Sequence, residues 1–432
     1  MKRVLIITYY WPPSGGAGVQ RWLKFVKYLR KEGWEPVIYT PENPEYPATD
    51  NSLTADIPSG IEIIRTPIWE PYSFYKKLVG AGKNERINAG FLSEKKRPGL
   101  AEKFSIWLRG NFFIPDARKF WIRPSVKFLT AYLSKHRVDA IVSTGPPHSM
   151  HMIALGVKQR TGLPWLADFR DPWTNIDFYH ELMLSRWADR KHHRMEMSIL
   201  KNADEVVVIS NSMKSDFLRL LKRDYTVITN GYDDSDISSE KTVADTRFSV
   251  AHIGTMVKTR NPDILWEALK AEVSENPDFA ANLEIKLVGS VDYSVLERLD
   301  QAGLTQFVNR IPYLPHNEVV KIQQQSQVLL LLINDTPNAR VILPGKFFEY
   351  MASGRPILCI GPSDGDAAQV IRETGTGYVV EKDDPDQMRA TLQLLFRKFR
   401  SGEPIQQGSD IGRFSRARLT AQLATRLDFI SR

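Results

Sequence analysis

The sequence predicts an α/β protein made of two doubly wound domains in tandem. The first observation is a strand, helix, strand pattern within residues 4–39, where an apolar run is followed by a helical stretch and a second apolar run. The second is that the same alternation resumes after residues 233–246, which are polar, lack periodicity and are expected to be a linker. Short apolar strands alternating with helices indicate parallel sheets, because a crossover helix joins two parallel strands.

The individual elements follow from apolar spacing. Residues 19–29 carry apolar side chains at helical spacing, and so do residues 413–432, which have no strand after them. In the first half, strands are expected at residues 4–8, 36–39, 138–143, 164–167, 205–209 and 225–228. In the second half, they are expected at residues 248–253, 283–288, 328–333, 357–360 and 377–380. These elements place the first domain at residues 1–235, the second at 236–412 and a final helix at 413–432.

The composition is that of a soluble globular protein, with 42% hydrophobic and 25% charged residues. The longest aliphatic run is residues 328–333, whereas a membrane-spanning helix needs about 20 apolar residues. No secretory signal is recognisable after Met1. The single cysteine, Cys359, excludes an intramolecular disulfide and fits a reducing compartment. We therefore expect a cytoplasmic protein.

The positive charge is concentrated in one segment. The net charge is +8, and residues 71–130 contain thirteen Lys or Arg against four Asp or Glu, interleaved with aromatic residues. Such a segment fits an anionic membrane surface. It could instead be a solvated insertion, or less readily contact single-stranded nucleic acid. We favour peripheral membrane contact and expect no nucleic-acid partner.

In open parallel sheets, ligands bind at the carboxyl ends of the strands. Gly15, Gly16 and Gly18 follow the first strand and precede a helix, so backbone N–H groups could approach an anion or a sugar there. The same glycines could simply make a tight turn. His148 follows another strand and could bond a sugar hydroxyl, shuttle a proton or only begin a helix.

Asp168 ends the next expected strand and could accept a proton or orient a hydroxyl. Asp168 and Asp171 flank Arg170, which could simply neutralise both carboxylates. In the second half, Asn261 is a good helix cap and Pro262 a good first helical residue, which places Arg260 just before a helix. There Arg260 could bind a phosphate or pair with a nearby acid.

Residues 338–356 are the most informative stretch. Pro344 suits a first helical turn, and Gly354 suits the position just past a helix end. Between them, Lys346 and Glu349 share one helix face and could hold a phosphate and a sugar hydroxyl, or form a surface ion pair. The sequence contains no recognisable metal cluster and no Ser–His–Asp or Cys–His signature, so we expect no metal or other cofactor.

The sequence resembles the family 4 retaining glycosyltransferases, which have the GT-B architecture of two tandem Rossmann-like domains. The resemblance rests on the Gly15-Gly16 turn, residues 230–233, Gly254 with the Arg260-Asn261-Pro262 turn, residues 311–315 and the block at 344–356. The last block, Gly-Lys-x-x-Glu-Tyr-x-Ala-x-Gly-x-Pro, is the specific one. The resemblance implies that the final helix crosses back to the first domain and that the domains close on a hinge near residues 233–246.

The resemblance also implies site roles. Glu349 matches the glutamate that holds the nucleotide ribose, Arg260 falls where a diphosphate-binding lysine is usual, and Lys346 could add charge. Thr255 falls where a partner arginine is common. The implied donor-binding residues are Gly15, Gly16, Gly254, Thr255, Arg260, Tyr313, Leu343, Gly345, Lys346 and Glu349. Together with the strand-end position of Asp168, the resemblance leads us to expect His148, Asp168, Arg260 and Lys346 as catalytic residues.

One position departs from the family pattern. Val341 stands where a glutamate normally contacts the donor sugar, and Asp335 or Asn338 could take its place. The implied reaction transfers a sugar from a nucleotide-diphosphate-sugar to a glycan or lipid-linked acceptor with retention, in cell-surface polysaccharide or glycolipid synthesis at the inner membrane face. The alternatives are a nucleotide-sugar epimerase of the same fold and a nucleotide-sugar-binding protein without turnover.

Overall fold

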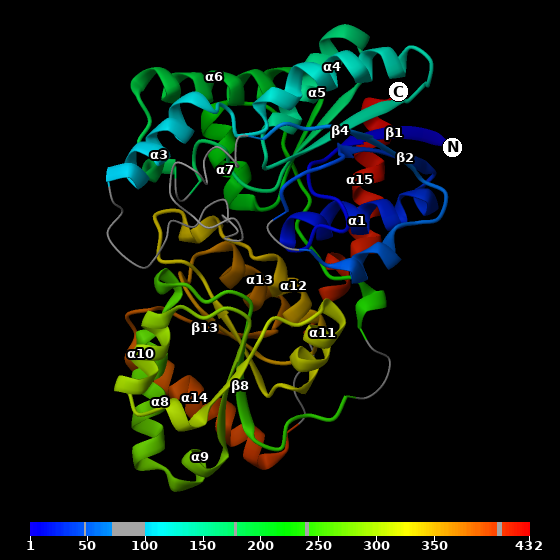
Figure 1. Ribbon diagram of the computed structural model, residues 1–432. Helices are drawn as coiled ribbons and strands as arrows, with labels where there is room; N and C mark the ends of the chain where they lie inside the picture. The colour runs from blue at the N-terminus through cyan, green and yellow to red at the C-terminus, as the bar shows by residue number, and fades with distance from the viewer. Residues whose placement is uncertain (47–48, 71–99, 177–178, 238–241, 404–407) are drawn as a thin grey trace. The chain divides into compact units, whose positions relative to one another are not determined.

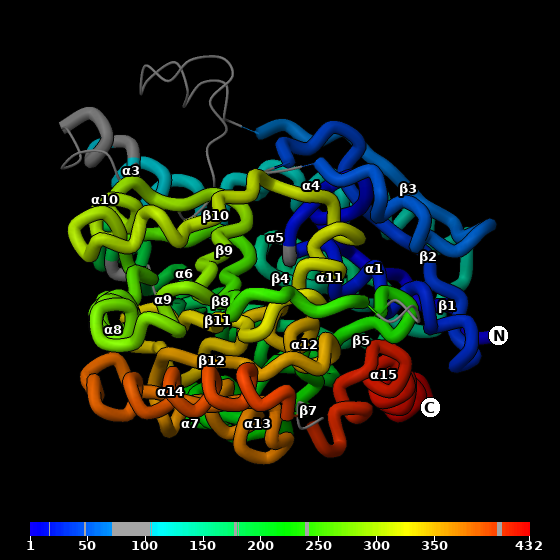
Figure 2. The backbone as a smooth tube through the Cα atoms, turned by 90° about the horizontal axis from the view of Figure 1, so that it is seen from below, coloured from blue at the N-terminus to red at the C-terminus, as the bar shows by residue number. Residues whose placement is uncertain are grey.

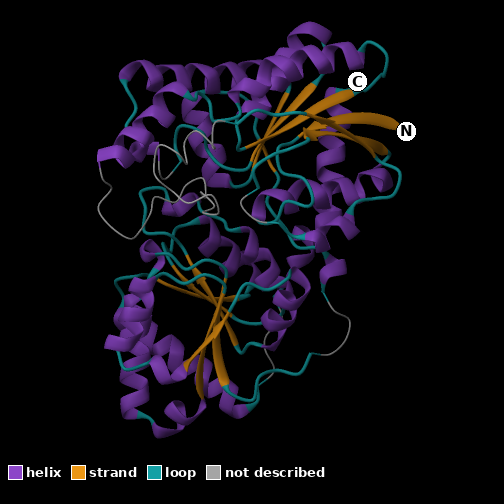
Figure 3. Cartoon of the chain, viewed as in Figure 1, coloured by secondary structure: helices purple, strands orange, loops and turns teal. Residues whose placement is uncertain are grey.

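The computed structural model describes residues 1–432 apart from 47–48, 71–99, 177–178, 238–241 and 404–407 (Figure 1). The described chain divides into two compact units. Unit 1 comprises Met1–Thr229 and Arg416–Arg432, and unit 2 comprises Asn230–Ser415. Each unit has helices packed around a central sheet, as Figure 3 shows. This is the predicted α/β fold of two doubly wound domains.

Unit 1 is built on a seven-stranded sheet in the order β3-β2-β1-β4-β5-β6-β7. All its strands are parallel. The strands are β1 (Lys2–Ile7), β2 (Trp34–Pro41), β3 (Glu62–Thr66), β4 (Ala140–Gly145), β5 (Trp165–Phe169), β6 (Glu205–Val208) and β7 (Thr226–Val227). Of these strands, only β3 was not predicted from the sequence. This edge strand is half exposed and carries charged residues, so it lacks the apolar run that marks the central strands.

Helices cover both faces of this sheet. They are α1 (Ala17–Leu29), α3 (Leu100–Phe112), α4 (Lys119–Leu133), α5 (Ser149–Thr161), α6 (Arg186–Asn202), α7 (Asn211–Leu220) and α15 (Arg416–Ile430). In β1, Leu5 and Ile7 join the core formed with α4, α5, α6 and α7. Val4 and Ile6 join the core formed with α1 and α15. The alternation along β1 therefore holds one helical layer on each face.

The last helix belongs to unit 1, as predicted. Leu419, Leu423 and Leu427 of α15 are buried in the same core as α1. The amine of Lys2 also bonds Asp428 at 2.9 Å. Figures 1 and 2 show α15 beside α1. The chain thus returns to its first unit after completing the second.

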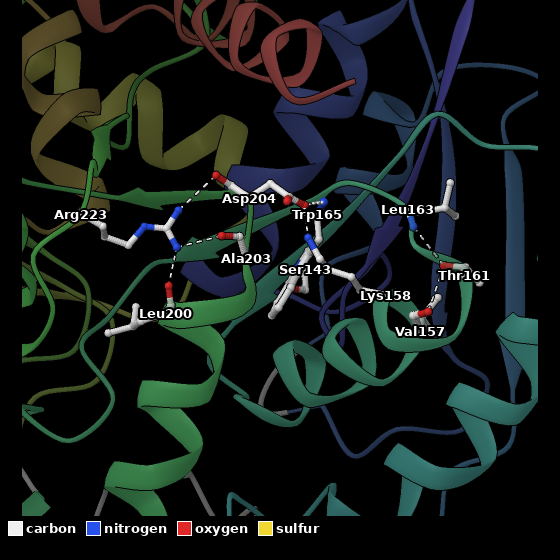
Figure 4. Close-up of polar contacts among 10 residues, drawn as sticks. All are labelled: Ser143, Val157, Lys158, Thr161, Leu163, Trp165, Leu200, Ala203, Asp204 and Arg223. Atoms are coloured by element: carbon white, nitrogen blue, oxygen red, sulfur yellow. Dashed lines mark hydrogen bonds and ion pairs between the residues drawn. The ribbon is translucent and has the colours of Figure 1, made fainter. Parts of the chain in front are cut away.

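The amino ends of β5 and β6 are fixed by polar contacts away from the ligand edge (Figure 4). Arg223 donates to the carbonyl oxygens of Leu200, Ala203 and Asp204. The carboxylate of Asp204 accepts from the backbone N–H of Trp165 at 2.7 Å and from Lys158. These contacts bind the polar groups of Arg223 and Asp204 within unit 1.

Unit 2 has a six-stranded parallel sheet in the order β10-β9-β8-β11-β12-β13. Its strands are β8 (Phe248–Ile253), β9 (Leu283–Val288), β10 (Val308–Ile311), β11 (Val328–Leu332), β12 (Ile357–Ile360) and β13 (Gly377–Val380). Four of them begin and end where the sequence analysis placed them. The edge strand β10, in which Asn309 and Arg310 are exposed, was not predicted.

The helices of unit 2 are α8 (Asp263–Glu275), α9 (Pro277–Asn282), α10 (Tyr293–Gln301), α11 (His316–Gln325), α12 (Gly345–Ala352), α13 (Asp366–Thr374) and α14 (Pro385–Ser401). One core joins the sheet to α8, α9, α10 and α14. The other joins it to α12 and α13, with Phe347, Phe348 and Tyr350 of α12 fully buried. The burial of three aromatic rings fixes α12 firmly against the sheet.

The unit boundaries differ from the expected ones. The first break lies at Thr229 and Asn230 rather than at residues 235 and 236, and the second lies at Ser415 and Arg416 rather than at 412 and 413. Part of the expected linker is structured. Asp233 is buried and caps a short 3-10 turn, and the backbone N–H of Asp245 donates to the carbonyl of Gln325 at 2.8 Å.

Two further observations concern membranes. Among the described residues, no helix is both long and apolar enough to cross a bilayer. Of the basic segment at 71–130, residues 71–99 lie outside the described part, and the rest forms α3, α4 and their connection.

Candidate functional site

In unit 2, two glycines open the carboxyl edge of the sheet. Gly254 follows β8 with φ 112° and Gly289 follows β9 with φ 106°, a region that favours glycine. The two lie so close that a Cβ on Gly289 would stand 3.1 Å from the carbonyl oxygen of Gly254. A side chain at either position would strain the backbone, and at Gly289 it would also crowd this edge.

Lys346 reaches this edge from the first turn of α12. Its amine donates to the carbonyl of Ile253 at 3.1 Å and lies 3.4 Å from the imidazole Nε2 of His252. Burial, and next the charge of Arg260, lower the pKa of Lys346 to about 7. Lys346 can therefore gain or lose a proton near neutral pH, and a bound anion would favour the charged form.

Tyr350, one turn further along α12, supports this arrangement. Its hydroxyl oxygen accepts from the backbone N–H of Ile253 at 3.1 Å, and the ring lies 5.9 Å from the Lys346 amine. The side chain is fully buried. Tyr350 was not among the predicted site residues, although its spacing of four residues from Lys346 places both on one helix face.

Arg260 approaches from another crossover. Its guanidinium donates to the side-chain oxygen of Asn334, which follows β11, and to the carbonyl of Thr255 at 3.4 Å. After burial, the charges of Lys346 and Arg260 hold the pKa of His252 well below its usual range. The two cations thus act on the same groups and converge on one edge of the sheet.

The local structure before α8 differs from the prediction. Arg260 ends a 3-10 turn, Lys258–Arg260, and α8 begins at Asp263 with Pro262 in the capping position. The side-chain oxygen of Asn261 accepts from the Trp266 indole at 2.7 Å instead of capping the helix. The side-chain oxygen of Asn261, which was predicted to cap the helix, therefore binds the buried Trp266 instead.

Glu349 and Lys346 have separate hydrogen-bond partners, which does not favour the alternative of a surface ion pair between them. One carboxylate oxygen of Glu349 accepts from the Gln323 amide at 3.2 Å. Gln323 is buried on α11 and can orient this carboxylate. The Lys346 amine instead points to Ile253. This leaves carboxylate lone pairs on Glu349 that could accept hydroxyl hydrogen bonds.

The N-terminus of α12 is open to an anion. Pro344 occupies the capping position rather than the first turn and has no side-chain cap bond, and the first turn contains no acidic residue. Gly345 is the first helical residue and adds no bulk. Backbone N–H groups at such an end lack helical partners and favour negative charge. Lys346 adds a full positive charge to the same turn.

Other expected donor-site residues are more dispersed. Leu343 is buried in the core and Tyr313 is 66% exposed. Thr255 is exposed beside Gly254. Val341 is half-buried in the 3-10 turn Ala339–Val341. Asp335 pairs with Lys382 at 2.5 Å on an exposed surface, so it is not held toward a sugar.

In unit 1, the glycine turn lies at the carboxyl end of β1. Gly16, with φ 90°, occupies the capping position of α1 and leaves this end without a side-chain cap. Gly18 has a packing role, because a Cβ there would stand 2.9 Å from the ring of Tyr10. Arg170 donates to the carbonyl of Gly18 at 2.7 Å and to that of Pro146. Gly15 is buried in the same turn.

Asp168 is enclosed, which argues against a role as proton acceptor. It is 1% exposed and pairs with Arg21 at 2.8 Å. Its oxygens also accept from the Trp22 indole at 2.7 Å and the Thr144 hydroxyl at 2.9 Å. Burial raises its pKa, but the charge and hydrogen bonds of Arg21 outweigh burial and lower it. Arg21, which was not singled out from the sequence, is the ion-pair partner of Asp168, and the charge of Arg170 also lowers the Asp168 pKa.

His148 occupies the capping position at the start of α5. It follows closely after Pro146, whose carbonyl accepts a hydrogen bond from Arg170. Its ring stacks on Trp173 with centroids 4.4 Å apart. Burial, then the charges of His151 and His192, hold its pKa well below the usual range. A neutral imidazole can bond a hydroxyl, but it cannot deliver a proton at neutral pH. His148 thus fits binding better than proton transfer.

The described parts of the chain thus have two polar carboxyl edges, one in each unit. In unit 2 the edge collects Gly254, Arg260, Gly345, Lys346 and Glu349. In unit 1 it collects the glycine turn, His148 and the enclosed Asp168. Among the described residues, no group of three His, Cys, Asp or Glu side chains is arranged to hold a metal.

Solved structures with the same fold cover almost the whole chain. Sucrose-phosphate synthase from Thermosynechococcus elongatus superposes with a TM-score of 0.62 and 15% identity, over 99% of each chain. HepE from Anabaena, solved in complex with UDP-glucose, has a TM-score of 0.58 and 12% identity, over 100% of this chain and 97% of that one.

The glycosyltransferase WaaG, involved in lipopolysaccharide biosynthesis, has a TM-score of 0.54 and 13% identity, over 99% of this chain and 96% of that one. No curated protein matches the sequence. Likeness at these identities establishes the fold, which is GT-B.

Family models place the sequence within this fold. Residues 15–231 match the glycosyl transferase 4-like domain. Residues 247–398 match the glycosyl transferases group 1 domain. The two matches fall one in each unit and together include most of the groups at the two carboxyl edges. The chain therefore belongs to the family 4, group 1 glycosyltransferases of the GT-B fold.

Proposed function

We propose that this glycosyltransferase binds a nucleotide-diphosphate-sugar at the carboxyl edge of unit 2 and transfers the sugar with retention to a glycan or lipid-linked acceptor. The observation that carries the proposal is the convergence of Lys346 and Arg260, from two different crossovers, at a glycine-lined edge beside an uncapped helix end. A diphosphate carries the complementary charge. The proposal assigns the ribose to Glu349, which Gln323 orients.

The chemistry follows from charge placement. When the bond to the anomeric carbon breaks, negative charge develops on the leaving diphosphate, and fixed donors nearby lower the barrier. Lys346, Arg260 and the first N–H groups of α12 are such donors. We assign no protein nucleophile and no metal, so retention would follow from attack on the face that the diphosphate leaves.

The same proposal places the enzyme in cell-surface polysaccharide or glycolipid synthesis, at the inner face of the cytoplasmic membrane. Support comes from the basic aromatic segment at 71–130. Further support comes from the fold shared with WaaG, whose own role is in lipopolysaccharide biosynthesis. The bound UDP-glucose of HepE supports a nucleotide-sugar donor for this fold.

A donor screen tests the proposal. Calorimetry with a panel of nucleotide-sugars should identify one donor, and the Glu349→Gln variant should bind it about 10-fold or more weakly because a charged hydrogen-bond acceptor is lost. The matched control is Glu297→Gln, an exposed position on α10 that should leave affinity unchanged.

Turnover is then measured with the selected donor. Transfer or slow hydrolysis of the sugar supports the enzyme, and a retained anomeric configuration supports the mechanism. Tight binding with neither transfer nor hydrolysis would mean a binding protein. An epimerised nucleotide-sugar product would replace the transferase with an epimerase.

A further inference from the structure

Exposed aromatic side chains gather between β3 and α4 in unit 1. Trp69 is 61% exposed and Phe120 is 42% exposed. Their ring centroids are 4.8 Å apart, and Phe113 lies 6.2 Å from Phe120. Isolated exposed aromatic residues are common, but a connected group of them marks an interaction surface.

The group continues along α3. Phe112, at the end of that helix, is 55% exposed, and its ring lies 5.7 Å from Trp107. Phe104, one helical turn before Trp107, is also exposed and stacks on the Trp107 ring with centroids 5.9 Å apart. The backbone carbonyl of Phe112 accepts from the amine of Lys119, which joins the end of α3 to the start of α4.

Helix α6 adds a part that the basic segment at 71–130 does not contain. Trp187 lies in its first turn and is 62% exposed. The chain just before it is fixed against α3, because Asn111 donates to the carbonyl of Met183 at 3.2 Å and accepts from the backbone N–H of Ser185 at 2.7 Å. Trp187 is therefore held near the end of α3.

Two lysines lie among these rings. The Lys119 amine is 4.8 Å from the Phe120 ring and 5.3 Å from the Phe113 ring. The Lys191 amine is 4.8 Å from the Trp187 ring. Burial lowers the pKa of Lys119, and the charge of Lys191 lowers it further because the two cations repel each other. An anion near both would relieve this repulsion.

Two acidic side chains on the adjoining elements, Asp116 and Asp189, have hydrogen-bond partners of their own. Asp116 accepts from both the backbone N–H and the hydroxyl of Ser149 at 2.8 Å. Asp189 of α6 accepts from the Tyr179 hydroxyl at 3.0 Å and lies 3.4 Å from His193. The exposed arginines on the same helices, Arg123, Arg186, Arg190 and Arg194, add to the positive charge.

We propose that this aromatic–lysine surface, made of Trp69, Phe112, Phe113, Lys119, Phe120, Trp187 and Lys191, docks the enzyme on the anionic phospholipid headgroups of a bilayer. Tryptophan and other aromatic rings are stable at the depth of the headgroups, and lysines beside them attract lipid phosphates. A soluble anion would need the lysines but not the exposed rings. A second copy of the same surface would be repelled by its like charge.

The proposal rests on the membrane location given under the proposed function and names the surface that makes the contact. Its test is sedimentation of the full chain with two sets of vesicles, one of phosphatidylcholine alone and one with about a third phosphatidylglycerol. The Lys119→Gln/Lys191→Gln double variant should bind anionic vesicles about 30-fold more weakly, because each lysine near such a surface contributes about fivefold to the affinity. The Trp187→Ser variant should also lose affinity, but its loss should persist at high salt.

The matched controls lie in unit 2. Lys270→Gln/Arg397→Gln removes two exposed cations, and Tyr293→Ser removes an aromatic ring that is 75% exposed. Neither should change vesicle binding. Calorimetric donor affinity should be unchanged in every variant of the surface, so a failure of docking is separable from a failure of the donor site. The single Lys191→Gln variant repeats the test without touching the bond from Lys119 to Phe112.

Four results would overturn the proposal. The first is equal binding to neutral and anionic vesicles, and the second is unchanged vesicle binding by the double variant. The third is that the wild type binds inorganic phosphate and the double variant does not, although the double variant still binds vesicles. The fourth is self-association of the protein that the Trp187→Ser variant abolishes. A fifth result would do the same: binding of a short single-stranded RNA that competes with vesicles would assign the surface to nucleic acid instead.

Discussion

The carboxyl edges of the two sheets carry similar residue types in different electrostatic states. In unit 1, Asp168 and Arg21 are 1% exposed and bind each other, and His148 is held neutral. In unit 2, the charges of Lys346 and Arg260 oppose one another, and the Lys346 pKa falls to about 7. One edge has bound its charges internally, whereas the other keeps cations whose repulsion an anionic ligand would relieve.

This difference indicates a division of labour. An enclosed ion pair fixes α1 to β5 and cannot exchange its partner for a substrate without a large cost. When a phosphate binds beside a half-buried lysine of lowered pKa, the negative charge stabilises the protonated amine. Strand-end carboxylates and cations are therefore not equivalent site markers, and burial and partners decide which of them can act on a ligand.

The first prediction concerns the enclosed pair. The Asp168→Asn change should lower the free energy of unfolding of unit 1 by about 3–5 kcal/mol, because Arg21 keeps a buried charge without its carboxylate. Urea unfolding followed by circular dichroism measures this. The control is Asp364→Asn, which breaks the exposed pair with Arg340 at 3.0 Å and should cost about 1 kcal/mol or less.

The comparison would break if Asp168→Asn unfolded like the wild type and still lost turnover. Asp168 would then belong with the groups that act on substrate. The enclosed edge of unit 1 would have to be treated as a reactive one.

The fold was predictable because its central strands are buried on both faces. Short, mostly apolar runs such as 248–253 and 357–360 are typical of strands buried on both faces, and they form β8 and β12 with the predicted bounds. The edge strands β3 and β10 were missed because their exposed faces carry Glu62, Arg65, Asn309 and Arg310. Exposure removes the signal on which the prediction depends.

The site was predictable only in part. The residues expected at helix ends pointed to Lys346, Glu349 and Arg260. The end of an expected strand pointed to Asp168. Partners distant in sequence could not be found this way. Arg21 meets Asp168 across 147 positions, and Tyr350 meets Ile253 across 97. Such pairs depend on the sheet order, which residue patterns do not reveal.

The second prediction concerns the cations of unit 2. Lys346→Met and Arg260→Met should each weaken donor binding by about 10- to 100-fold, because each removes a charge-assisted hydrogen bond worth about 1.5–3 kcal/mol. Stability should not fall with Lys346→Met, since burial already disfavours the charged amine. Calorimetry with the donor and thermal unfolding measure the two effects.

Lys270→Met is the matched control, because Lys270 is exposed on α8 and should leave both quantities unchanged. Unchanged donor affinity in both Lys346→Met and Arg260→Met would remove the diphosphate from this edge. Loss of stability in Lys346→Met would mean that the amine is a structural group, like Arg21 in unit 1.

The third prediction uses the lowered pKa of Lys346. A bound diphosphate raises this pKa, so donor binding takes up a proton when the free amine is deprotonated. Affinity should be constant below pH 7 and fall about tenfold per pH unit above it, until the raised pKa of the complex is reached. Calorimetry in buffers of different ionisation enthalpy should detect the proton uptake.

The Lys346→Arg variant sharpens this result. A guanidinium stays protonated throughout this range, so its donor affinity should not depend on pH between 7 and 9. A wild-type profile that is also flat would show that Lys346 is not the group that senses the diphosphate.

The smallest predicted effect returns to the neutral histidines of unit 1. Burial lowers the pKa of His151 to about 3 and holds that of His148 well below its usual range. Above the ordinary histidine pKa of about 6.5, both histidines are neutral in the folded and in the unfolded chain, so neither makes the free energy of unfolding depend on pH. As the pH falls below that value, the unfolded chain binds protons that the folded chain does not. Each histidine should therefore remove about 1.4 kcal/mol per pH unit.

The His148→Phe variant keeps a ring that can stack on Trp173 and removes one of these protons. Its loss of unfolding free energy between pH 6 and pH 4.5 should be smaller than that of the wild type by about 1.4 kcal/mol per pH unit. The slope is measured by urea unfolding at a series of pH values. An unchanged slope would mean that His148 takes up a proton in the folded protein, and the neutral, internally bound edge of unit 1 would then titrate as the edge of unit 2 does.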